Sequence, residues 1–560
     1  MKSSKFWLRI SLLYSLYYGF CFYYFVFNQE YLIQDDARQH VVWLQRFSDR
    51  ELFPNDVIAD YFSGLAPSGF KYLYFIAAKL GIEPVLFAKL LPPILALITT
   101  IYLYWFTLQI LLIPLTGFIS SVLINQLIWL NDDIVSSTAR AFIYPLFAAF
   151  LYYLAKQNII PCLIIMLLQG LFYPHILLIE MGVLSLRLPI FKIRVWGEST
   201  NRKQSYKSYI WWIAGCLVTA ISLYPMTQKP PELATTVTAW QMRQMPEFNL
   251  GGRSPFFGVG WFSYWLTRSS GLSLALFPTI VWSSLLLPWL IKKPRINKLI
   301  NSNLTILTQV IVASLTMFFL AHLLLPSLHL PSRYTYHTLR FALAIFSSIV
   351  LTIAIDKYHR WLRTKKQFNL VDRIKITLVG LFASVLVIVP AIPWLSINYF
   401  QSWQIGTAPK IYQYLARQPK DILVASLSDE VNNIPAFTQR SILVGGEFAL
   451  AYHPAYYSQI EQRTVALLRS QYSSDLNLVK SFIRQYQIDY LLLDKDAFTP
   501  KYLQTKSWLI NSSWSSETKK AIAQLESTGT PALQKTINSC SVVSTRTLNL
   551  LSGSCILKRS

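Results

Sequence analysis

The sequence predicts a polytopic α-helical membrane protein with an α/β domain outside the membrane at its C-terminus. Of its 560 residues, 53% are hydrophobic and only 14% are charged, which is a low charged fraction for a soluble protein. Several apolar runs also reach the roughly 20 residues that cross a bilayer. After residue 397 these long runs give way to short apolar segments between polar ones. We therefore predict a membrane core at 1–397 and a separate domain at 398–560.

The net charge of +24 is distributed as in a membrane protein. Lysine and arginine cluster in short loops between the apolar runs, which is how membrane proteins mark their cytoplasmic side. The sequence contains no nucleic-acid-binding motif. We therefore expect membrane lipid as a partner, and no nucleic acid.

The first apolar run, 10–27, follows a short basic N-terminus. The run stays bulky and aromatic to its end and lacks the small-residue pattern of a signal-peptide cleavage site. We expect a retained first helix whose N-terminus is cytoplasmic. A long polar and aromatic loop, 28–83, follows it.

Later spans follow from the positions of the remaining apolar runs. The run at 159–188 is too long for one span and contains Pro174, which disfavours a continuous helix, so we predict two short helices there. The total is about eleven spans. The other predicted spans are 84–104, 108–130, a segment ending near 156, 209–224, a segment ending at 292, 304–325, a segment ending before 357, and 376–395.

The distribution of basic residues among the loops tests the predicted number of spans. With the N-terminus inside, the basic loops at 187–207, 292–298 and 357–375 all face the cytoplasm, as the positive-inside rule requires. The C-terminal domain then lies outside the membrane. The remaining loops on that side are 28–83, 131–140, 225–270 and 326–340.

In the C-terminal domain, 421–426 and 490–494 are typical of short buried strands, and 464–471 and 476–486 of helices between them. This pattern predicts an α/β fold. The domain also contains Cys540 and Cys555, which would pair in an oxidising compartment.

An acidic pair, Asp35 and Asp36, follows the first span directly. An amphipathic pattern continues from it, which suits a helix lying at the membrane surface and holding the acids near the lipid boundary. The alternative is a solvated helix start with one of the acids as its N-cap. The apolar face comprises Ala37, Val41, Leu44 and Phe47, and the polar face comprises Arg38, Gln45, Arg46 and Asp49.

Two further groups of polar residues lie on the same predicted side. Asp132 and Asp133 occupy the second external loop, and Arg333, His337 and Arg340 occupy a later one. Together with the first acids they indicate a site at the membrane surface. For the second acidic pair a helix-end cap is the alternative. For the basic group the alternative is anchoring to lipid headgroups.

These features resemble the GT-C superfamily of integral-membrane glycosyltransferases. The resemblance rests on Asp35-Asp36 in a long first external loop, Asp132-Asp133 on the second, about eleven spans and an external C-terminal domain. Similar proteins include the protein O-mannosyltransferases, the aminoarabinose transferases and the catalytic subunit of oligosaccharyltransferase. The Trp-Trp-Asp triplet that marks the last group is absent, which argues against asparagine-linked glycosylation.

The resemblance implies transfer of a sugar from a polyprenyl-phosphate-linked donor to a glycan, lipid or protein acceptor outside the cytoplasm. Asp36, or else Asp35, would deprotonate the acceptor hydroxyl, because a neighbouring acid makes a carboxylate more basic. Loop 225–270 would close over the acceptor. Further roles in this reading are lipid-phosphate binding by Arg333, His337 and Arg340, and orientation of the acceptor or of a divalent cation (Mg or Mn) by Asp132 and Asp133.

Two other functions fit the same architecture. One is a transporter or flippase of lipid-linked glycans, although such proteins usually show internal repeats and charges within their spans. The other is a non-catalytic scaffold for envelope assembly. A loss of function in Asp36→Asn protein that still folds would favour the enzyme over the scaffold.

Overall fold

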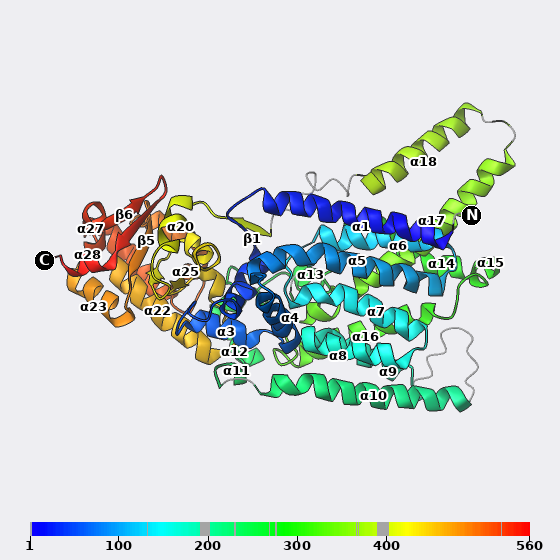
Figure 1. The fold of residues 1–560 in the computed structure, drawn as a ribbon, viewed down its shortest axis with the longest axis horizontal. Helices are drawn as coiled ribbons and strands as arrows, with labels where there is room; N and C mark the ends of the chain where they lie inside the picture. Colours follow the sequence, from blue (N-terminus) through cyan, green and yellow to red (C-terminus); the bar gives the residue numbers. More distant parts are fainter. Residues whose placement is uncertain are drawn as a thin grey trace.

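The computed structural model describes residues 3–131, 133–190, 202–228, 231–267, 269–274, 277–365, 367, 369–388, 402–527 and 529–559. Figure 1 shows a bundle of roughly parallel helices at one end of an elongated molecule and a smaller region of strands and helices at the other. The N-terminus lies at the far end of the bundle, and the C-terminus lies at the opposite tip of the molecule.

The bundle contains helices that are long and apolar enough to cross a membrane: α1 (Ser4–Phe27), α5 (Pro84–Ile110), residues 206–225 of α10 (Arg202–Thr227), α16 (Leu304–Leu323) and α17 (Thr338–Thr364). Shorter apolar helices complete it: α6 (Pro114–Trp129), α7 (Ile143–Ala155), α8 (Ile159–Phe172), α9 (Pro174–Leu186), η4 (Thr279–Leu286) and α14 (Leu287–Ile291). The chain is therefore an integral membrane protein. The total of about eleven spans stays a prediction, because the last one extends beyond α18 (Leu370–Ile388) into residues outside the described ranges.

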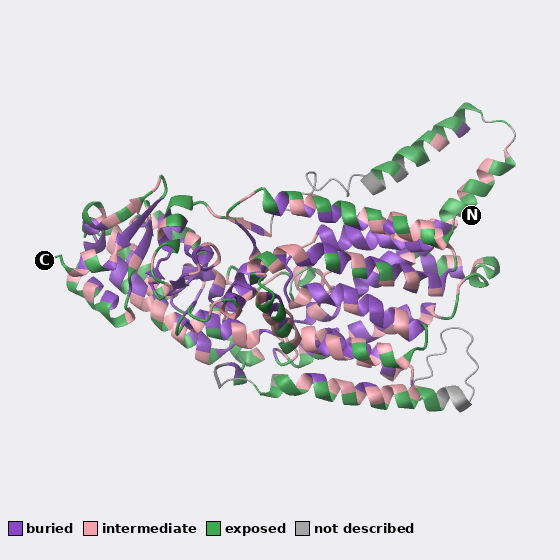
Figure 2. Cartoon of the chain, in the orientation of Figure 1, coloured by how far each residue is buried: buried purple, intermediate pink, exposed green. Residues whose placement is uncertain are grey.

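Pro174 divides the long apolar run as predicted. Helix α8 ends at Phe172, and Pro174 is the first residue of α9, a position where its fixed φ and missing N–H cost nothing. Figure 2 shows buried positions inside the bundle and exposed ones on the outer sides of α1 and α10. Apolar side chains such as Phe20 and Leu217 are more than half exposed there, as expected of surfaces that meet lipid tails rather than water.

The C-terminal region, residues 402–559, folds around a mixed sheet of order β4-β3-β5-β7-β6. β3 pairs in parallel with β4 and β5, and β7 pairs antiparallel with β5 and β6. The predicted strands correspond to β3 and β5. The strands are β3 (Leu423–Ala425), β4 (Ser441–Ile442), β5 (Tyr490–Asp494), β6 (Ser541–Ser544) and β7 (Leu548–Ser552).

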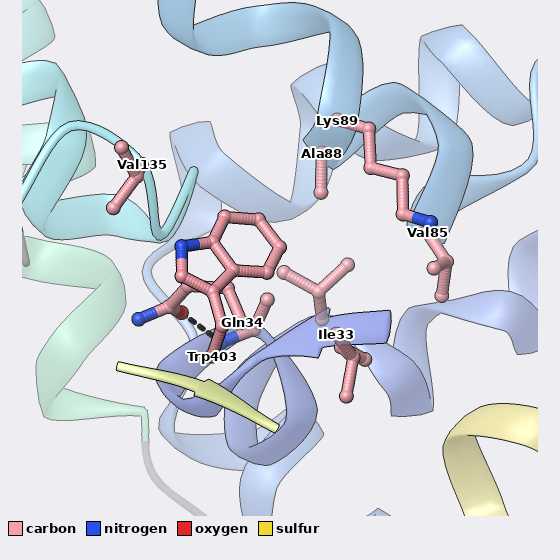
Figure 3. Close-up of a pocket in the computed structure, with 9 residues that line it drawn as sticks. Ile33, Gln34, Val85, Ala88, Lys89, Val135 and Trp403 are labelled. Atoms are coloured by element: carbon pink, nitrogen blue, oxygen red, sulfur yellow. Dashed lines mark hydrogen bonds between the residues drawn. The ribbon is translucent and has the colours of Figure 1, made fainter. Parts of the chain in front are cut away.

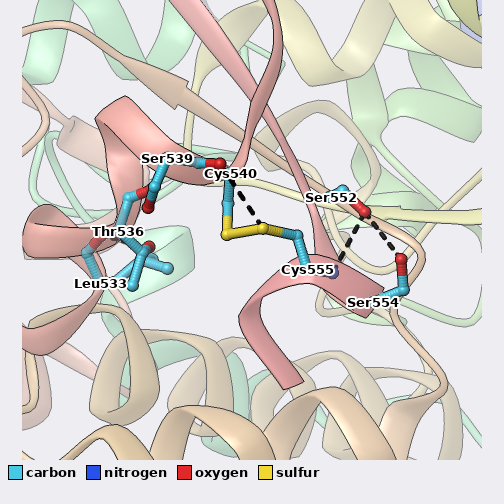
Figure 4. Close-up of a disulfide and its surroundings, with 7 residues drawn as sticks. All are labelled: Leu533, Thr536, Ser539, Cys540, Ser552, Ser554 and Cys555. Atoms are coloured by element: carbon cyan, nitrogen blue, oxygen red, sulfur yellow. Dashed lines mark hydrogen bonds between the residues drawn. A yellow bond between two sulfur atoms is a disulfide. The ribbon is translucent and has the colours of Figure 1, made fainter. Parts of the chain in front are cut away.

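Helices cover this sheet. The two predicted from the sequence are the long α22 (Pro454–Tyr472) and α23 (Leu476–Tyr486). The others are α20 (Pro409–Ala416), η8 (Asp429–Asn433), α21 (Ile434–Thr438), η9 (Gly446–Phe448), α24 (Pro500–Thr505), α25 (Ser507–Ile510), α26 (Ser515–Glu526), α27 (Ala532–Cys540) and α28 (Gly553–Leu557). A disulfide joins Cys540, the last residue of α27, to Cys555 in α28 (Figure 4), so the predicted pairing is confirmed.

Two segments lie between the bundle and the C-terminal region. The first, 28–83, contains β1 (Leu32–Gln34), α2 (Asp35–His40), η1 (Val42–Phe47), α3 (Val57–Leu65) and α4 (Ser68–Lys79). The second, 231–267, contains α11 (Pro231–Ala234), α12 (Ala239–Gln244), η3 (Pro246–Phe248) and α13 (Trp261–Leu266). Both contact the C-terminal region through the hydrogen bonds described below.

The predicted surface helix after the acidic pair differs from the expectation. The helix is short, because α2 gives way to the tighter η1 after Val41. Part of its predicted polar face is not in water: Arg38 and Gln45 are 5% and 3% exposed. The C-terminal region covers this face, where Arg38 donates to Asn433 and Gln439 donates to Gln45. Periodicity identified the apolar face correctly but gave no sign of this cover.

Candidate functional site

The acidic pair is fixed in place by its neighbours in the sequence. The side chain of Gln34 accepts a hydrogen bond from the Ala37 amide at 2.8 Å and so caps α2. The predicted cap by Asp35 or Asp36 is therefore wrong, and both carboxylates are left for other partners. β1 pairs with β2 (Trp403–Ile405), and the Asp35 amide donates to the Ser402 carbonyl at 2.8 Å. These backbone contacts thus fix the start of α2 to the beginning of the C-terminal region.

Asp35 and Asp36 bind different arginines. Arg38 Nη2 lies 2.6 Å from Asp35 Oδ1, whereas Asp36 pairs with Arg140 Nη2. The side chains of Asp35 and Asp36 are 34% and 30% exposed. Each acid is therefore ion-paired and still open to a substrate from one side.

Arg140 connects the first acids to the second acidic loop. It lies in η2 (Ala139–Phe142), and its Nε lies 3.5 Å from Asp133 Oδ1 while Nη2 holds Asp36. Sequence reasoning missed this residue. The sequence did contain an indication of its role, because Arg140 is the single basic residue of loop 131–140, which also carries the acidic pair Asp132 and Asp133.

Asp133 is fully buried and its oxygens are surrounded by donors. Arg340 forms an ion pair with it, and Tyr144 Oη donates to its Oδ2 at 2.5 Å. Burial raises the pKa of Asp133, but the charges of Arg340 and Arg140 and the hydrogen bond from Tyr144 outweigh burial and hold that pKa below its ordinary value. Asp132 lies outside the described residues.

The basic group predicted from the sequence is present but divided. Arg340 stacks over the Tyr336 ring at 3.6 Å and donates to Tyr144 Oη at 3.1 Å. His337 Nδ1 lies 3.0 Å from the same hydroxyl oxygen. Burial lowers the pKa of His337 well below its ordinary value, and Asp133 opposes this only in part. His337 is therefore neutral, and both residues serve the Asp133 network.

Arg333 is the exception in this group. It lies in η5 (Pro331–Tyr334) and is half-buried. Within the described parts of the chain, its guanidinium has no hydrogen-bond or ion-pair partner. Its charge acts on the same groups as that of Asp36: burial lowers the pKa of His40, Asp36 opposes this, and Arg140 and Arg333 add to it. Asp36 and Arg333 also both act on Tyr173, so the two charges belong to the same part of the molecule.

A carboxylate from the C-terminal region completes the site. Glu447, in η9, lies 3.2 Å from Arg38 Nη2 and 2.6 Å from Arg253 Nη2. Burial raises the pKa of Glu447 to about 7; Arg253 and Arg38 oppose this shift, while Asp35 and Asp36 add to it. Nothing in the sequence near Glu447 indicated this contact.

An apolar pocket is lined by residues of β1, α2, α5, β2 and the loop that carries Val135 (Figure 3). Figure 3 shows the Trp403 ring between β1 and the loop that carries Val135, with Lys89 on α5 at the edge. The lining residues are Ile33, Gln34, Ala37, Val41, Val85, Ala88, Lys89, Val135 and Trp403.

A cation site was also predicted. Among the residues that the structure describes, no group of three or more His, Cys, Asp or Glu side chains is arranged to hold a metal ion. Asp133 is taken up by arginines and a tyrosine. The described donors therefore do not form a divalent-cation site by themselves.

The fold of the chain is similar to that of a solved membrane glycosyltransferase structure, an archaeal oligosaccharyltransferase. Among solved structures, the oligosaccharyltransferase of Archaeoglobus fulgidus in its apo form matches 92% of this chain and 72% of its own, with a TM-score of 0.54 and 12% identity. ArnT from Cupriavidus metallidurans bound to undecaprenyl phosphate matches over 100% of both chains, with a TM-score of 0.49 and 10% identity. No protein-family model and no curated protein matches the sequence. Likeness at such identities establishes the fold alone.

Proposed function

We propose that this protein is a membrane glycosyltransferase that moves a sugar from a polyprenyl-phosphate-linked donor to an acceptor on the extracytoplasmic face. The observation that carries the proposal is a partly exposed carboxylate, Asp36, whose charge acts on the same histidine as that of Arg333, a cation with no hydrogen-bond or ion-pair partner among the described residues. A base and a phosphate-binding charge are the two groups that such a transfer needs.

In this mechanism Asp36 accepts the proton of the acceptor hydroxyl while the oxygen bonds to the anomeric carbon of the sugar. The bond from that carbon to the phosphate oxygen breaks, and polyprenyl phosphate leaves with the electron pair. Arg333 stabilises the negative charge of the leaving phosphate, since a guanidinium matches phosphate geometry. Arg140 holds Asp36 in position through their ion pair.

Most of the remaining predicted residues are assigned roles in positioning Arg333 and Arg140. Arg340 and His337 are buried against Asp133 and Tyr144, so we propose that they fix the loop carrying Arg333 instead of binding phosphate directly. Asp133 acts through Arg140. Asp35 is the second candidate base, and a divalent cation stays a prediction.

Two further observations support the location and the lipid substrate. The disulfide between Cys540 and Cys555 favours an oxidising compartment for the C-terminal region, with the N-terminus then in the cytoplasm. The apolar pocket with Lys89 at its edge (Figure 3) suits the start of a lipid chain and its headgroup charge.

The test uses purified protein in liposomes with a panel of undecaprenyl-phosphate-linked hexoses and pentoses, and measures release of undecaprenyl phosphate. We expect Asp36→Asn to lower the rate by about 10²–10⁴. The matched control is Asp60→Asn, because Asp60 also pairs with an arginine in the same segment but is 62% exposed. Equal rates for Asp36→Asn and the unchanged protein would refute the assignment.

A transporter of lipid-linked glycans is the second candidate, and one residue favours it. Glu180 is fully buried within α9 and has no hydrogen-bond partner among the described residues, and an acid inside a span is a common mark of a transport path. Flipping of a fluorescent lipid-linked glycan that is lost in Glu180→Gln and retained in Asp36→Asn would support transport over transfer.

A further inference from the structure

Glu447 joins three parts of the molecule that are far apart in the sequence. It belongs to η9 of the C-terminal region, and its carboxylate contacts Arg38 of α2 and Arg253 of segment 231–267. We propose that Glu447 is a positioning residue: its carboxyl group bridges α2 and segment 231–267 and holds them against the C-terminal region most strongly when it is protonated, so that the acidic pair keeps its place.

The geometry on the α2 side places Glu447 one contact away from the acids. Arg38 uses Nη2 for both Asp35, at 2.6 Å, and Glu447, at 3.2 Å, while its Nη1 donates to Asn433 at 2.8 Å. Gln39 Nε2 donates to the Glu447 carbonyl at 3.0 Å. Loss of the Glu447 carboxylate therefore changes the surroundings of Asp35 through Arg38.

On the side of segment 231–267, Arg253 joins the segment to the turn that carries Glu447. Arg253 donates to the carbonyls of Gly446 and Glu447 at 3.2 and 3.1 Å, in addition to the carboxylate of Glu447 at 2.6 Å. A second contact lies close by, because Glu247 accepts from the amide of Ser513 at 2.6 Å. Further hydrogen bonds join the segment to the C-terminal region, from Val237 N to the Tyr452 carbonyl at 3.0 Å and from Asn511 Nδ2 to the Gly251 carbonyl at 3.1 Å.

The turn that carries Glu447 is rigid. A Cβ atom added to Gly446 would lie 2.8 Å from Trp508 Cγ, so the backbone packs directly on that ring. The Glu447 amide donates to Asn432 Oδ1 at 3.1 Å. Because both neighbours belong to the same sheet-based region, the carboxylate is presented by a fixed element rather than by a free loop.

The charges around Glu447 make the contact sensitive to pH. The groups that face it are Arg38, Asp35 and Asp36 on α2, and Arg253 on segment 231–267. Burial first, and then the two aspartates, raise the pKa of Glu447 from 4.5 to about 7. The raised pKa means that the docked form favours the protonated acid over the carboxylate. The resulting stabilisation is complete below the ordinary pKa of 4.5 and is lost as pH rises through about 7.

Hydrogen–deuterium exchange on the full chain tests the proposal. It is followed in residues 35–47 and 245–257 at a series of pH values on both sides of 7 and corrected for intrinsic exchange. We expect protection of both segments to fall as pH rises, with a midpoint near 7. In Glu447→Gln this midpoint disappears. In Arg253→Gln, whose side chain is 31% exposed, protection falls in 245–257 and stays in 35–47.

The matched control is Glu517→Gln, which removes an acid of the same region that pairs at the surface with Arg469 and Lys520. It should keep the pH midpoint of the unchanged protein. Protection that is independent of pH in the unchanged protein, or a midpoint that persists in Glu447→Gln, would overturn the proposal.

The consequence for sugar transfer rests on the proposed function, whereas the exchange measurement does not. If the protein transfers sugar, Glu447→Gln should remove the ionisation near pH 7 from its rate profile and leave the profile of Glu517→Gln unchanged. If exchange behaves as expected and no sugar transfer occurs, the positioning role stands and the transferase assignment fails.

Discussion

Removal of the Asp133 carboxylate is the sharpest test of the buried charge network. The side chains of Asp133 and Arg340 are 0% and 2% exposed, and that of Arg140 is 15% exposed. Asp133→Ala therefore leaves a buried guanidinium without its counter-charge. Breaking a buried ion pair from one side typically costs about 3–5 kcal/mol. Tyr144 also loses its acceptor, but this loss belongs to the same network and is not added separately.

The chain provides its own unfolding probe for this prediction. Cys162 is fully buried, whereas the free thiols of Cys21 and Cys216 are partly exposed, so in a Cys21→Ser/Cys216→Ser background the reaction of Cys162 with a thiol reagent reports opening of the bundle during a denaturant titration in detergent. We expect Asp133→Ala to lower the free energy of unfolding by about 3–5 kcal/mol. The exposed pair of Asp60 with Arg46 supplies the control, since Asp60→Ala should cost only about 0–1 kcal/mol.

A double variant separates the loss of the pair from other effects. In Asp133→Leu/Arg340→Met both charges are replaced by apolar groups, a change that is often nearly neutral for a buried pair. The double variant should therefore be more stable than Asp133→Leu alone. Strict additivity of the two single losses, or a loss below about 1 kcal/mol in Asp133→Ala, would refute the reasoning.

Two further predictions concern the ligand and the C-terminal region. Arg333→Ala should weaken binding of undecaprenyl phosphate, measured by calorimetry in detergent, about tenfold or more, and Arg333→Lys should restore part of the affinity. The control is Arg295→Ala, which should not change the affinity because this arginine lies in the exposed α15 (Pro294–Asn297). Equal affinities for Arg333→Ala and the unchanged protein would remove Arg333 from the site. Cys540→Ser should lower the stability of the oxidised C-terminal region by about 3 kcal/mol, because the disulfide closes a loop with a separation of 15 residues. A reductant should abolish the difference between Cys540→Ser and the unchanged protein.

The sequence predicted those parts of the fold that depend on local pattern. Pro174 marked the break between α8 and α9 because proline has the same backbone consequence in any context. The strands β3 and β5 followed from short apolar runs. The grouping of Asp35, Asp36 and the residues near Arg333 followed from counting spans, since the outer ends of helices meet at one side of a bundle.

The partners within the site depended on contacts that no local pattern contains. Arg38 and Asn433 are 395 positions apart, and the amphipathic pattern of α2 is the same whether its polar face meets water or protein. Arg140 contacts both Asp36 and Asp133, because its side chain is long enough to reach two loops. Glu447 was missed for the same reason: a lone acid in a turn has meaning only through its neighbours.

The charges of the site form two alternating chains, one from the C-terminal region to Asp35 and one from Asp36 to α17. Buried charges are costly unless each has a partner of opposite sign, and here nearly all of them do. The pairs are Arg253 with Glu447, Glu447 with Arg38, Arg38 with Asp35, Asp36 with Arg140, Arg140 with Asp133, and Asp133 with Arg340. Within the described residues of this group the arginines outnumber the carboxylates by one, and Arg333 is left over. In the proposed reaction a lipid-linked sugar would bring a phosphate anion to Arg333 and the electrophilic anomeric carbon of the donor sugar to the acceptor hydroxyl.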